Sequence, residues 1–138
     1  MMTVCRYTTT GALAMALTGC GAASGPETGA AGVGGDFDGD GAGDLAIGVP
    51  VFPYASDGRP GHVAVFFGPL PRGQHSRDDA DALFRGSDQA DGFGRRLAAG
   101  DTDGDGIDDL VVGAPSDSTI EVASGAVYLF LGGTEPLL

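Results

Sequence analysis

Lysine and tryptophan are missing from this 138-residue chain, and cysteine is missing beyond residue 20. The two cysteines, Cys5 and Cys20, both lie in the first twenty residues, so no disulfide framework holds the remainder. All seven basic residues are arginine, against 19 acidic residues, and the net charge is −12. This excess of acidic groups argues against nucleic acid as a partner. The length indicates one domain.

The groups that catalysis needs are also scarce. The chain has no Gly-x-Ser-x-Gly motif and no cysteine after residue 20. Its two histidines, His62 in an expected strand and His75 in an expected loop, have no recognisable partner. No set of acid, base and nucleophile is visible, so the sequence predicts that the chain is not an enzyme.

Glycine and aspartate are abundant, and they gather in two matching segments. The first is Asp36-Phe37-Asp38-Gly39-Asp40-Gly41-Ala42-Gly43-Asp44, and the second is Asp101-Thr102-Asp103-Gly104-Asp105-Gly106-Ile107-Asp108-Asp109. Each has aspartate at positions 1, 3, 5 and 9 and glycine at positions 4 and 6, and the two segments start 65 residues apart. Two matching copies indicate an internal repeat.

The four carboxylates of each segment repel one another unless a cation lies between them. Calcium takes about 6–8 oxygen ligands and accepts irregular geometry. Glycine at position 6 turns the backbone with positive φ at no steric cost. The carbonyl oxygen at position 7, which is Ile107 in the second copy, can add one more ligand. The sequence therefore predicts calcium-binding loops.

The flanking residues distinguish between two kinds of calcium loop. An EF-hand has an acidic ligand at position 12 and lies between helices. Here position 12 is Ile47 or Val112, in short apolar runs that end before Pro50 and Pro115. Such runs are typical of strands. We therefore expect calcium-binding β-turns rather than EF-hands, with strands at 44–49, 61–68, 82–86, 109–114 and 125–132.

The first twenty residues resemble a bacterial lipoprotein signal peptide. Arg6 precedes an apolar run at 11–17 that is shorter than the about 20 residues that span a bilayer. Leu17-Thr18-Gly19-Cys20 resembles a lipobox, which implies cleavage before Cys20 and lipidation of its thiol. The alternative is an ordinary secretory signal with an unrelated cysteine. Gly21 after the cysteine favours the outer membrane if the host is Gram-negative.

The repeated part resembles the FG-GAP repeat of integrin α-chain β-propellers and of related bacterial surface proteins. Phe93-Gly94 matches the FG pair, residues 101–109 the calcium loop, and Gly113-Ala114-Pro115 the GAP segment. The first copy has a complete calcium loop, but its GAP segment reads Gly48-Val49-Pro50 and it has no Phe-Gly pair. The resemblance covers about residues 35–133.

This resemblance implies an all-β fold, a partial β-propeller of about two blades of antiparallel strands with calcium-binding hairpin loops. The expected organisation is a signal peptide at 1–20, a flexible Gly/Ala tether at 21–34, a first repeat at 35–91 with an incomplete start, and a second repeat at 92–138 with a truncated end. The resemblance also implies two Ca²⁺ sites. Their ligands would be Asp36, Asp38, Asp40, the Ala42 carbonyl and Asp44, and Asp101, Asp103, Asp105, the Ile107 carbonyl and Asp109.

Three functions remain open at this point. The first is a calcium-binding module of a secreted cell-envelope lipoprotein, anchored in the membrane through Cys20, which presents a rigid surface to an unknown protein or cell-surface ligand in adhesion. The second is a non-catalytic accessory portion of a larger secreted hydrolase, and the third is a vestigial structural fragment. Because two open blades leave unpaired edges, we expect either a fragment of a larger propeller or self-association or pairing with other propeller blades.

Overall fold

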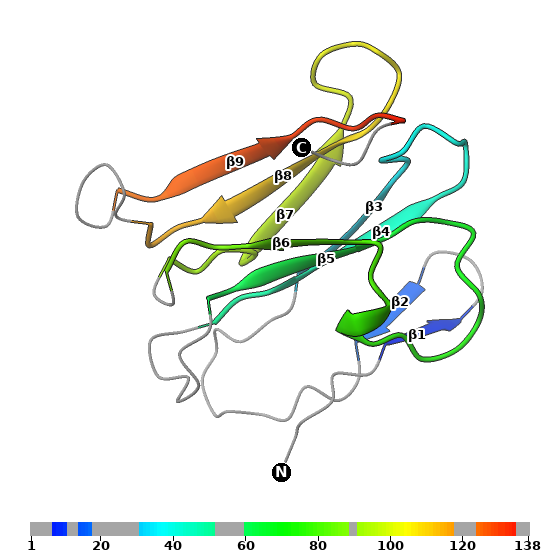
Figure 1. Ribbon diagram of the computed structural model, residues 1–138, viewed down its shortest axis with the longest axis horizontal. Helices are drawn as coiled ribbons and strands as arrows, with labels where there is room; N and C mark the ends of the chain where they lie inside the picture. The colour runs from blue at the N-terminus through cyan, green and yellow to red at the C-terminus, as the bar shows by residue number, and fades with distance from the viewer. Residues whose placement is uncertain are drawn as a thin grey trace.

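The computed structural model describes residues 7–10, 14–17, 31–51, 60–88, 91–117 and 124–134. Within these ranges the chain forms nine strands and one short 3-10 helix: β1 (Tyr7–Thr10), β2 (Ala14–Leu17), β3 (Ala31–Gly35), β4 (Asp44–Val49), β5 (His62–Phe66), η1 (Arg77–Asp79), β6 (Ala82–Arg85), β7 (Arg96–Gly100), β8 (Asp109–Ala114) and β9 (Ala126–Phe130). All pairing is antiparallel, in sheets of order β1-β2, β3-β4-β5-β6 and β7-β8-β9 (Figure 1).

The two larger sheets are copies of one design. In the first sheet Leu45 on β4 lies opposite Phe66 on β5, and in the second Leu110 on β8 lies opposite Phe130 on β9. Each central strand follows directly from an Asp/Gly loop. The five strands expected from the apolar runs are all present, with ends that differ by at most two residues. The all-β prediction is confirmed.

The start of the first repeat differs from expectation. Residues 31–34, which were assigned to a flexible tether, belong to β3, so this sheet has an opening strand. The segment Ala-Gly-Val-Gly-Gly has little strand propensity of its own, and it is ordered by pairing along its length with β4. Close packing explains one of its glycines. A Cβ on Gly35 would lie 2.9 Å from the Phe37 ring and 3.0 Å from the Asp108 carboxylate.

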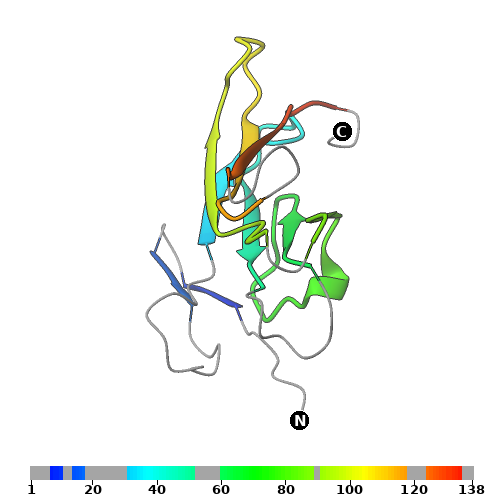
Figure 2. The ribbon, with the colours of Figure 1, turned by 90° about the vertical axis from the view of Figure 1, so that its left-hand side faces the viewer.

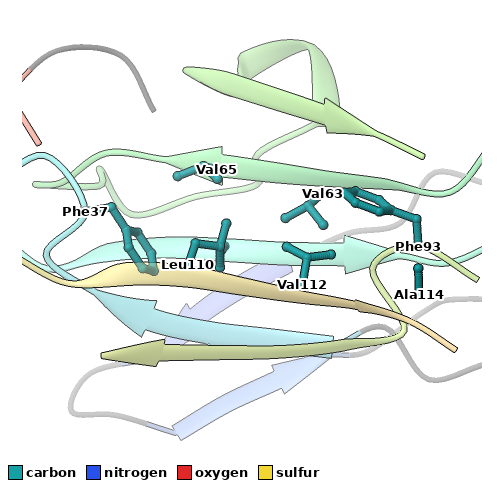
Figure 3. Packing of buried hydrophobic residues seen from close by; sticks show 8 residues of the cluster. Phe37, Val63, Val65, Phe93, Leu110, Val112 and Ala114 are labelled. Carbon is teal, nitrogen blue, oxygen red and sulfur yellow. The ribbon is translucent and has the colours of Figure 1, made fainter. Parts of the chain in front are cut away.

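The two larger sheets pack face to face over the main hydrophobic core (Figure 3). Alternate residues of β4 and β5 point into this space, as the period of a strand requires. The buried members of the core are Phe37, Ala46, Val63, Val65, Phe93, Leu110, Val112 and Ala114. Because both sheets contribute to it, the core joins the two repeats into one body.

The second repeat contacts the first through its Phe93-Gly94 turn. Phe93 is 2% exposed, and Gly94 has a φ of 84°, a conformation that favours glycine. A Cβ on Gly48 would overlap the Gly94 carbonyl oxygen and lie 2.9 Å from its carbonyl carbon. The Phe-Gly pair of one repeat therefore fits against a glycine of the preceding repeat.

The opposite face of the first sheet carries a second cluster of buried residues: Leu45, Ile47, Ala64 and Phe66. Leu70 and Ala80, from the connection between β5 and β6, pack against this cluster. The first sheet is thus buried on both faces.

The N-terminal region is described only at β1 and β2, which form a hairpin with Tyr7 opposite Leu17. The predicted lipidation site Cys20 and residues 21–30 lie outside the described residues. Among the described residues no helix has the length and apolarity to cross a bilayer. The signal peptide and lipid anchor therefore stay predictions.

Candidate metal centres in the two Asp/Gly loops

The two acidic loops connect the first and second strands of each large sheet, at the same end of the molecule (Figure 1). Glycines at positions 4 and 6 have positive φ in both loops: 74° at Gly39 and 84° at Gly41, and 86° at Gly104 and 92° at Gly106. The second loop extends beyond the sheets (Figure 2). The shared backbone turns give both copies the same scaffold for their carboxylates.

The first aspartate of each loop is held by backbone amides from both of these glycines. Gly39 and Gly41 donate to the two oxygens of Asp36 at 2.8 and 3.0 Å. In the second loop Gly104 and Gly106 donate to Asp101 at 2.6 and 3.0 Å. The loop therefore folds around the carboxylate at position 1.

The aspartates at positions 3 and 5 of each loop accept a hydrogen bond from the backbone amide two residues further along the chain. In the first loop these bonds are Asp40 N–H to Asp38 at 3.1 Å and Ala42 N–H to Asp40 at 2.6 Å. The second loop repeats them, from Asp105 to Asp103 at 3.1 Å and from Ile107 to Asp105 at 2.8 Å. Each of these bonds uses one carboxylate oxygen, and the second oxygen has lone pairs that it can offer to a cation.

The aspartate at position 9 has a different environment, because it is buried and hydrogen-bonded to residues at the end of the sheet. Asp44 accepts from the amides of Phe37 at 2.6 Å and Gly68 at 2.7 Å. Asp109 accepts from the amide and hydroxyl of Thr102 and from the amide of Gly132 at 2.9 Å. The Thr102 hydroxyl bond and then the Gly132 bond hold the pKa of Asp109 below its usual range. The aspartate at position 9 therefore bonds the loop to the segment just after β5 in the first sheet and just after β9 in the second.

Two groups of carboxylates come close enough together to hold a metal ion. Asp36, Asp38 and Asp40 each place an oxygen within 4.8 Å of the others, and so do Asp101, Asp103 and Asp109. Loss of hydration, together with the nearby carboxylates of Asp44, Asp40 and Asp36, raises the pKa of Asp38. The donors are all hard oxygens, which fits calcium or magnesium rather than a soft metal.

The two groups differ in one member. The first contains the residue at position 5 and leaves out Asp44, whereas the second contains Asp109 and leaves out Asp105. Ala42 and Ile107 lie at position 7 of the loops, where their backbone amides donate to the aspartate at position 5. Their roles as carbonyl ligands, and those of Asp44 and Asp105, stay predictions.

Asp108, which is not among the ligands predicted from the sequence, joins the two loops. Its carboxylate accepts a hydrogen bond from the Asp36 amide at 3.1 Å, and its own amide donates to the Asp36 carbonyl at 2.9 Å. Gly133 donates to the Phe37 carbonyl at 3.0 Å beside this pair. The first loop is thereby bonded to the second repeat.

Two buried aspartates outside the loops have structural roles that the sequence analysis did not predict. Asp91 is 2% exposed and accepts from the amide of Phe93 at 2.8 Å, so it shapes the Phe-Gly turn. Asp117 is also 2% exposed and accepts the hydroxyl of Tyr128 at 2.5 Å. A carboxylate two residues before the Phe-Gly pair was the available signal for the first of these. Nothing local marks the second, because its partner lies in the next strand.

The bond between Tyr128 and Asp117 predicts a pH effect. This bond, followed by burial, raises the pKa of Tyr128 above its ordinary value of 10.0, so the phenol contributes stability fully below pH 10 and loses it as pH rises through the folded-state value. Urea unfolding between about pH 8 and 12 should show the advantage of wild type over Tyr128→Phe shrinking with pH. The chain has no lysine to obscure this window. A constant difference would contradict the assignment.

Comparison with known proteins matches this architecture. The FG-GAP repeat model matches residues 28–66 and 93–130, two segments that each contain an acidic loop and its flanking strands. The chain belongs to the FG-GAP repeat family. The first match begins at residue 28, which agrees with the opening strand β3. As predicted, the two large sheets are FG-GAP blades, and the fold is a partial β-propeller.

Several relatives share about 70% of this chain. It is 33% identical over 105 residues to phosphatidylinositol-glycan-specific phospholipase D of Bos taurus, covering 72% of this chain and 12% of that protein. It is 35% identical over 99 residues to integrin alpha-5 of Xenopus laevis, covering 70% and 9%. With human integrin alpha-X the identity is 43% over 106 residues, covering 73% and 8%. The chain thus spans about a tenth of these relatives.

Proposed function

We propose that this FG-GAP chain is a calcium-binding module whose two loops each hold one Ca²⁺ ion. The observation that carries the proposal is the matched pair of loops. In both, backbone amides orient the carboxylates at positions 1, 3 and 5, and three carboxylate oxygens lie within 4.8 Å of one another. Bringing like charges together in this way is unfavourable without a cation.

The donor set fits calcium and suggests a weak site. The proposed ligands are the four aspartates of each loop with the carbonyls of Ala42 and Ile107. No glutamate is available in either loop to bind in a bidentate manner. Carboxylates that are partly exposed, without such a residue, suit a dissociation constant in the extracellular range of about 10⁻⁴–10⁻³ M. Calcium would act here as a structural ion that removes the repulsion within each loop.

The bound ions would stiffen one end of the molecule. Both loops lie at this end, and the pairing of Asp108 with Asp36 connects them. A rigid loop surface costs less ordering entropy when a partner binds. We therefore propose that this end presents a firm surface for adhesion to a protein or cell-surface ligand. The proposed setting is the cell envelope, with a lipid anchor at Cys20 and, in a Gram-negative host, the outer membrane.

Calorimetric titration and thermal unfolding test calcium binding directly. Millimolar calcium should release heat at two sites and stabilise the chain by about 1–3 kcal/mol per site when calcium exceeds the dissociation constant by about 10- to 100-fold. Asp103→Asn should abolish the second site, and Asp38→Asn the first. Two unaltered sites in both variants would exclude these loops.

The control for charge is Asp78→Asn, which removes one carboxylate outside the loops. Asp78 is exposed on η1 and contacts Arg77 at 3.3 Å. Its replacement should leave the calcium titration unchanged. A loss of binding in this control would mean that overall negative charge, rather than the loops, attracts the ion.

A second candidate function is a non-catalytic accessory portion of a larger secreted hydrolase. The similarity to phosphatidylinositol-glycan-specific phospholipase D favours it, because the matched part is only 12% of that protein. On this proposal the chain itself has no hydrolase activity. Hydrolysis of an ester or phosphodiester substrate by the purified chain would contradict it, if the activity persists in the loop variants Asp38→Asn and Asp103→Asn.

A further inference from the structure

Residues 107–109 of the second loop belong to one proposed calcium site and contact the other. Asp109 is one of the three aspartates of the second loop whose oxygens lie within 4.8 Å of one another. Its neighbour Asp108 donates its amide to the Asp36 carbonyl at 2.9 Å, and its carboxylate accepts the Asp36 amide at 3.1 Å. Asp36 is the first aspartate of the other loop. This segment therefore connects a proposed ligand of one ion to a proposed ligand of the other.

Ile107 adds an apolar contact to this bridge. A Cβ on Gly39 of the first loop would lie 2.8 Å from Ile107 Cδ1 and 3.1 Å from Ile107 Cγ1, so the Ile107 side chain lies against the Gly39 backbone. The Gly39 amide is one of the donors that orient the Asp36 carboxylate. The second loop thus touches the first at two points, and both points position the same carboxylate.

The side chain of the bridge comes from the second loop alone. The residue that matches Asp108 in the first loop is Gly43, which has no side chain with which to form such a bond. A Cβ on Gly43 would meet nothing within 4 Å in the part of the chain that the structure describes. Asp108 is therefore the carboxylate through which the two loops can influence each other.

This bridge gives the coupling between the sites a definite sign. An ion in the second loop would fix residues 107–109 and, through their contacts, the backbone of Asp36. A site that is already ordered costs its ligand less conformational entropy, which gives positive cooperativity. Repulsion between the two ions acts in the opposite direction. However, the four aspartates of a loop exceed the charge of one Ca²⁺, so a filled loop stays negative, and salt screens the remaining effect.

We propose that the two loops bind calcium cooperatively and that Asp108 is the positioning residue that couples them. This inference rests on the proposed calcium binding and adds how each site affects the other. Each filled site should raise the calcium affinity of the other about 5- to 20-fold, the lower part of the usual range for coupled sites. Both loops would then become rigid together as the calcium concentration rises.

An NMR titration of the isotope-labelled full chain, at about 0.15 M salt to screen charges, follows the two sites separately. The Gly41 amide reports on the first loop and the Gly106 amide on the second. Asp103→Asn leaves the first site alone and Asp38→Asn leaves the second alone, so each variant gives one single-site constant. The coupling factor is the product of the two wild-type association constants divided by the product of the two single-site constants.

Four substitutions, each made in the wild type and in both single-site variants, separate the bridge from the effect of charge. Asp108→Ala removes the acceptor of the Asp36 amide and should lower the coupling factor at least about threefold, within the range for one hydrogen bond. Asp108→Asn loses the charge but keeps an acceptor oxygen, so it should retain the coupling. Ile107→Ala keeps its carbonyl, removes the contact with Gly39 and should also lower the coupling, which gives a second test if Asp108→Ala folds poorly. Asp78→Ala removes a carboxylate outside the loops and should leave the coupling unchanged.

Hydrogen exchange tests the same path without fitting binding constants. In Asp38→Asn the first site is disabled, yet calcium at the second site should slow exchange of the Asp36 amide, because this amide donates to Asp108. The slowing should be absent when Asp38→Asn is combined with Asp108→Ala.

The outcomes distinguish this inference from calcium binding itself. Two sites that bind calcium with a coupling factor of one or less would overturn the inference and leave the proposed function standing. Loop amides that calcium shifts in neither loop would overturn both. Equal coupling in wild type, Asp108→Ala and Ile107→Ala, with unchanged circular dichroism, would overturn the assignment of the coupling to this bridge.

Discussion

Replacing Gly48 with alanine should destabilise the fold by at least about 3 kcal/mol. A Cβ at this position overlaps the Gly94 carbonyl oxygen and lies 3.2 Å from the Gly94 Cα, so it meets backbone rather than a side chain that can move aside. Relief requires the two sheets to separate at the Phe-Gly turn, which opens the core around Val63. For a domain of about 100 residues this loss lowers Tm by roughly 12–24 °C.

The repeat supplies a matched control for this prediction. Gly113 holds the same position in the second sheet, and its nearest neighbour to an added Cβ is the Cβ of Arg96 at 3.4 Å, an ordinary contact. Gly113→Ala should therefore change the unfolding free energy by less than about 1 kcal/mol. Thermal or urea unfolding of both variants at the same protein concentration gives the comparison. Equal losses would show that Gly48 is sensitive for a reason other than the sheet–sheet contact.

The sequence predicted the loops and central strands well because their signals are local. Asp and Gly at fixed positions determine the turn directly, and the structure has positive φ at Gly39, Gly41, Gly104 and Gly106. The apolar runs after each loop are short and rich in β-branched residues, so they predict buried strands without tertiary information. The convergence of the carboxylates at positions 1 and 3 follows from the same local geometry.

The features that the sequence did not reveal depend on contacts between distant segments. Strand β3 is glycine-rich and forms through its pairing with β4, so composition alone indicated a tether. Asp108 bonds to the Asp36 backbone, 72 residues away. Leu70 and Ala80 cover the outer face of the first sheet only because the β5–β6 connection folds back over it. In each case the residue type permits several roles and the tertiary partner selects one.

Position 9 shows how the two kinds of information combine. Its aspartate was predicted as a metal ligand from the spacing. In the structure Asp44 and Asp109 accept hydrogen bonds from the loop and from the residues just after β5 and β9. An ionised carboxylate has about four lone-pair sites, so these bonds leave capacity for an ion. The same residue can therefore couple the loop to the sheet and, under our proposal, couple calcium to both.

Replacing Phe93 with alanine should cost about 3–5 kcal/mol of unfolding free energy, the range for deleting a buried aromatic side chain. Phe93 is 2% exposed and lies between the two sheets, with its ring centroid 5.3 Å from that of Tyr128 in an edge-on arrangement (Figure 3). Asp91 fixes its backbone, so the turn cannot easily collapse into the cavity. With a typical domain stability of about 5–15 kcal/mol, this loss removes much of what holds the repeats together.

Chemical unfolding of Phe93→Ala against Phe84→Ala separates this anchoring role from general aromatic packing. Phe84 is only partly buried on β6, and its ring centroid lies 4.1 Å from that of Phe130, so its removal leaves a site that water can fill. Its expected cost is below about 2 kcal/mol. If Phe84→Ala were as damaging as Phe93→Ala, the Phe-Gly turn would be one aromatic contact among several rather than the anchor between the two repeats.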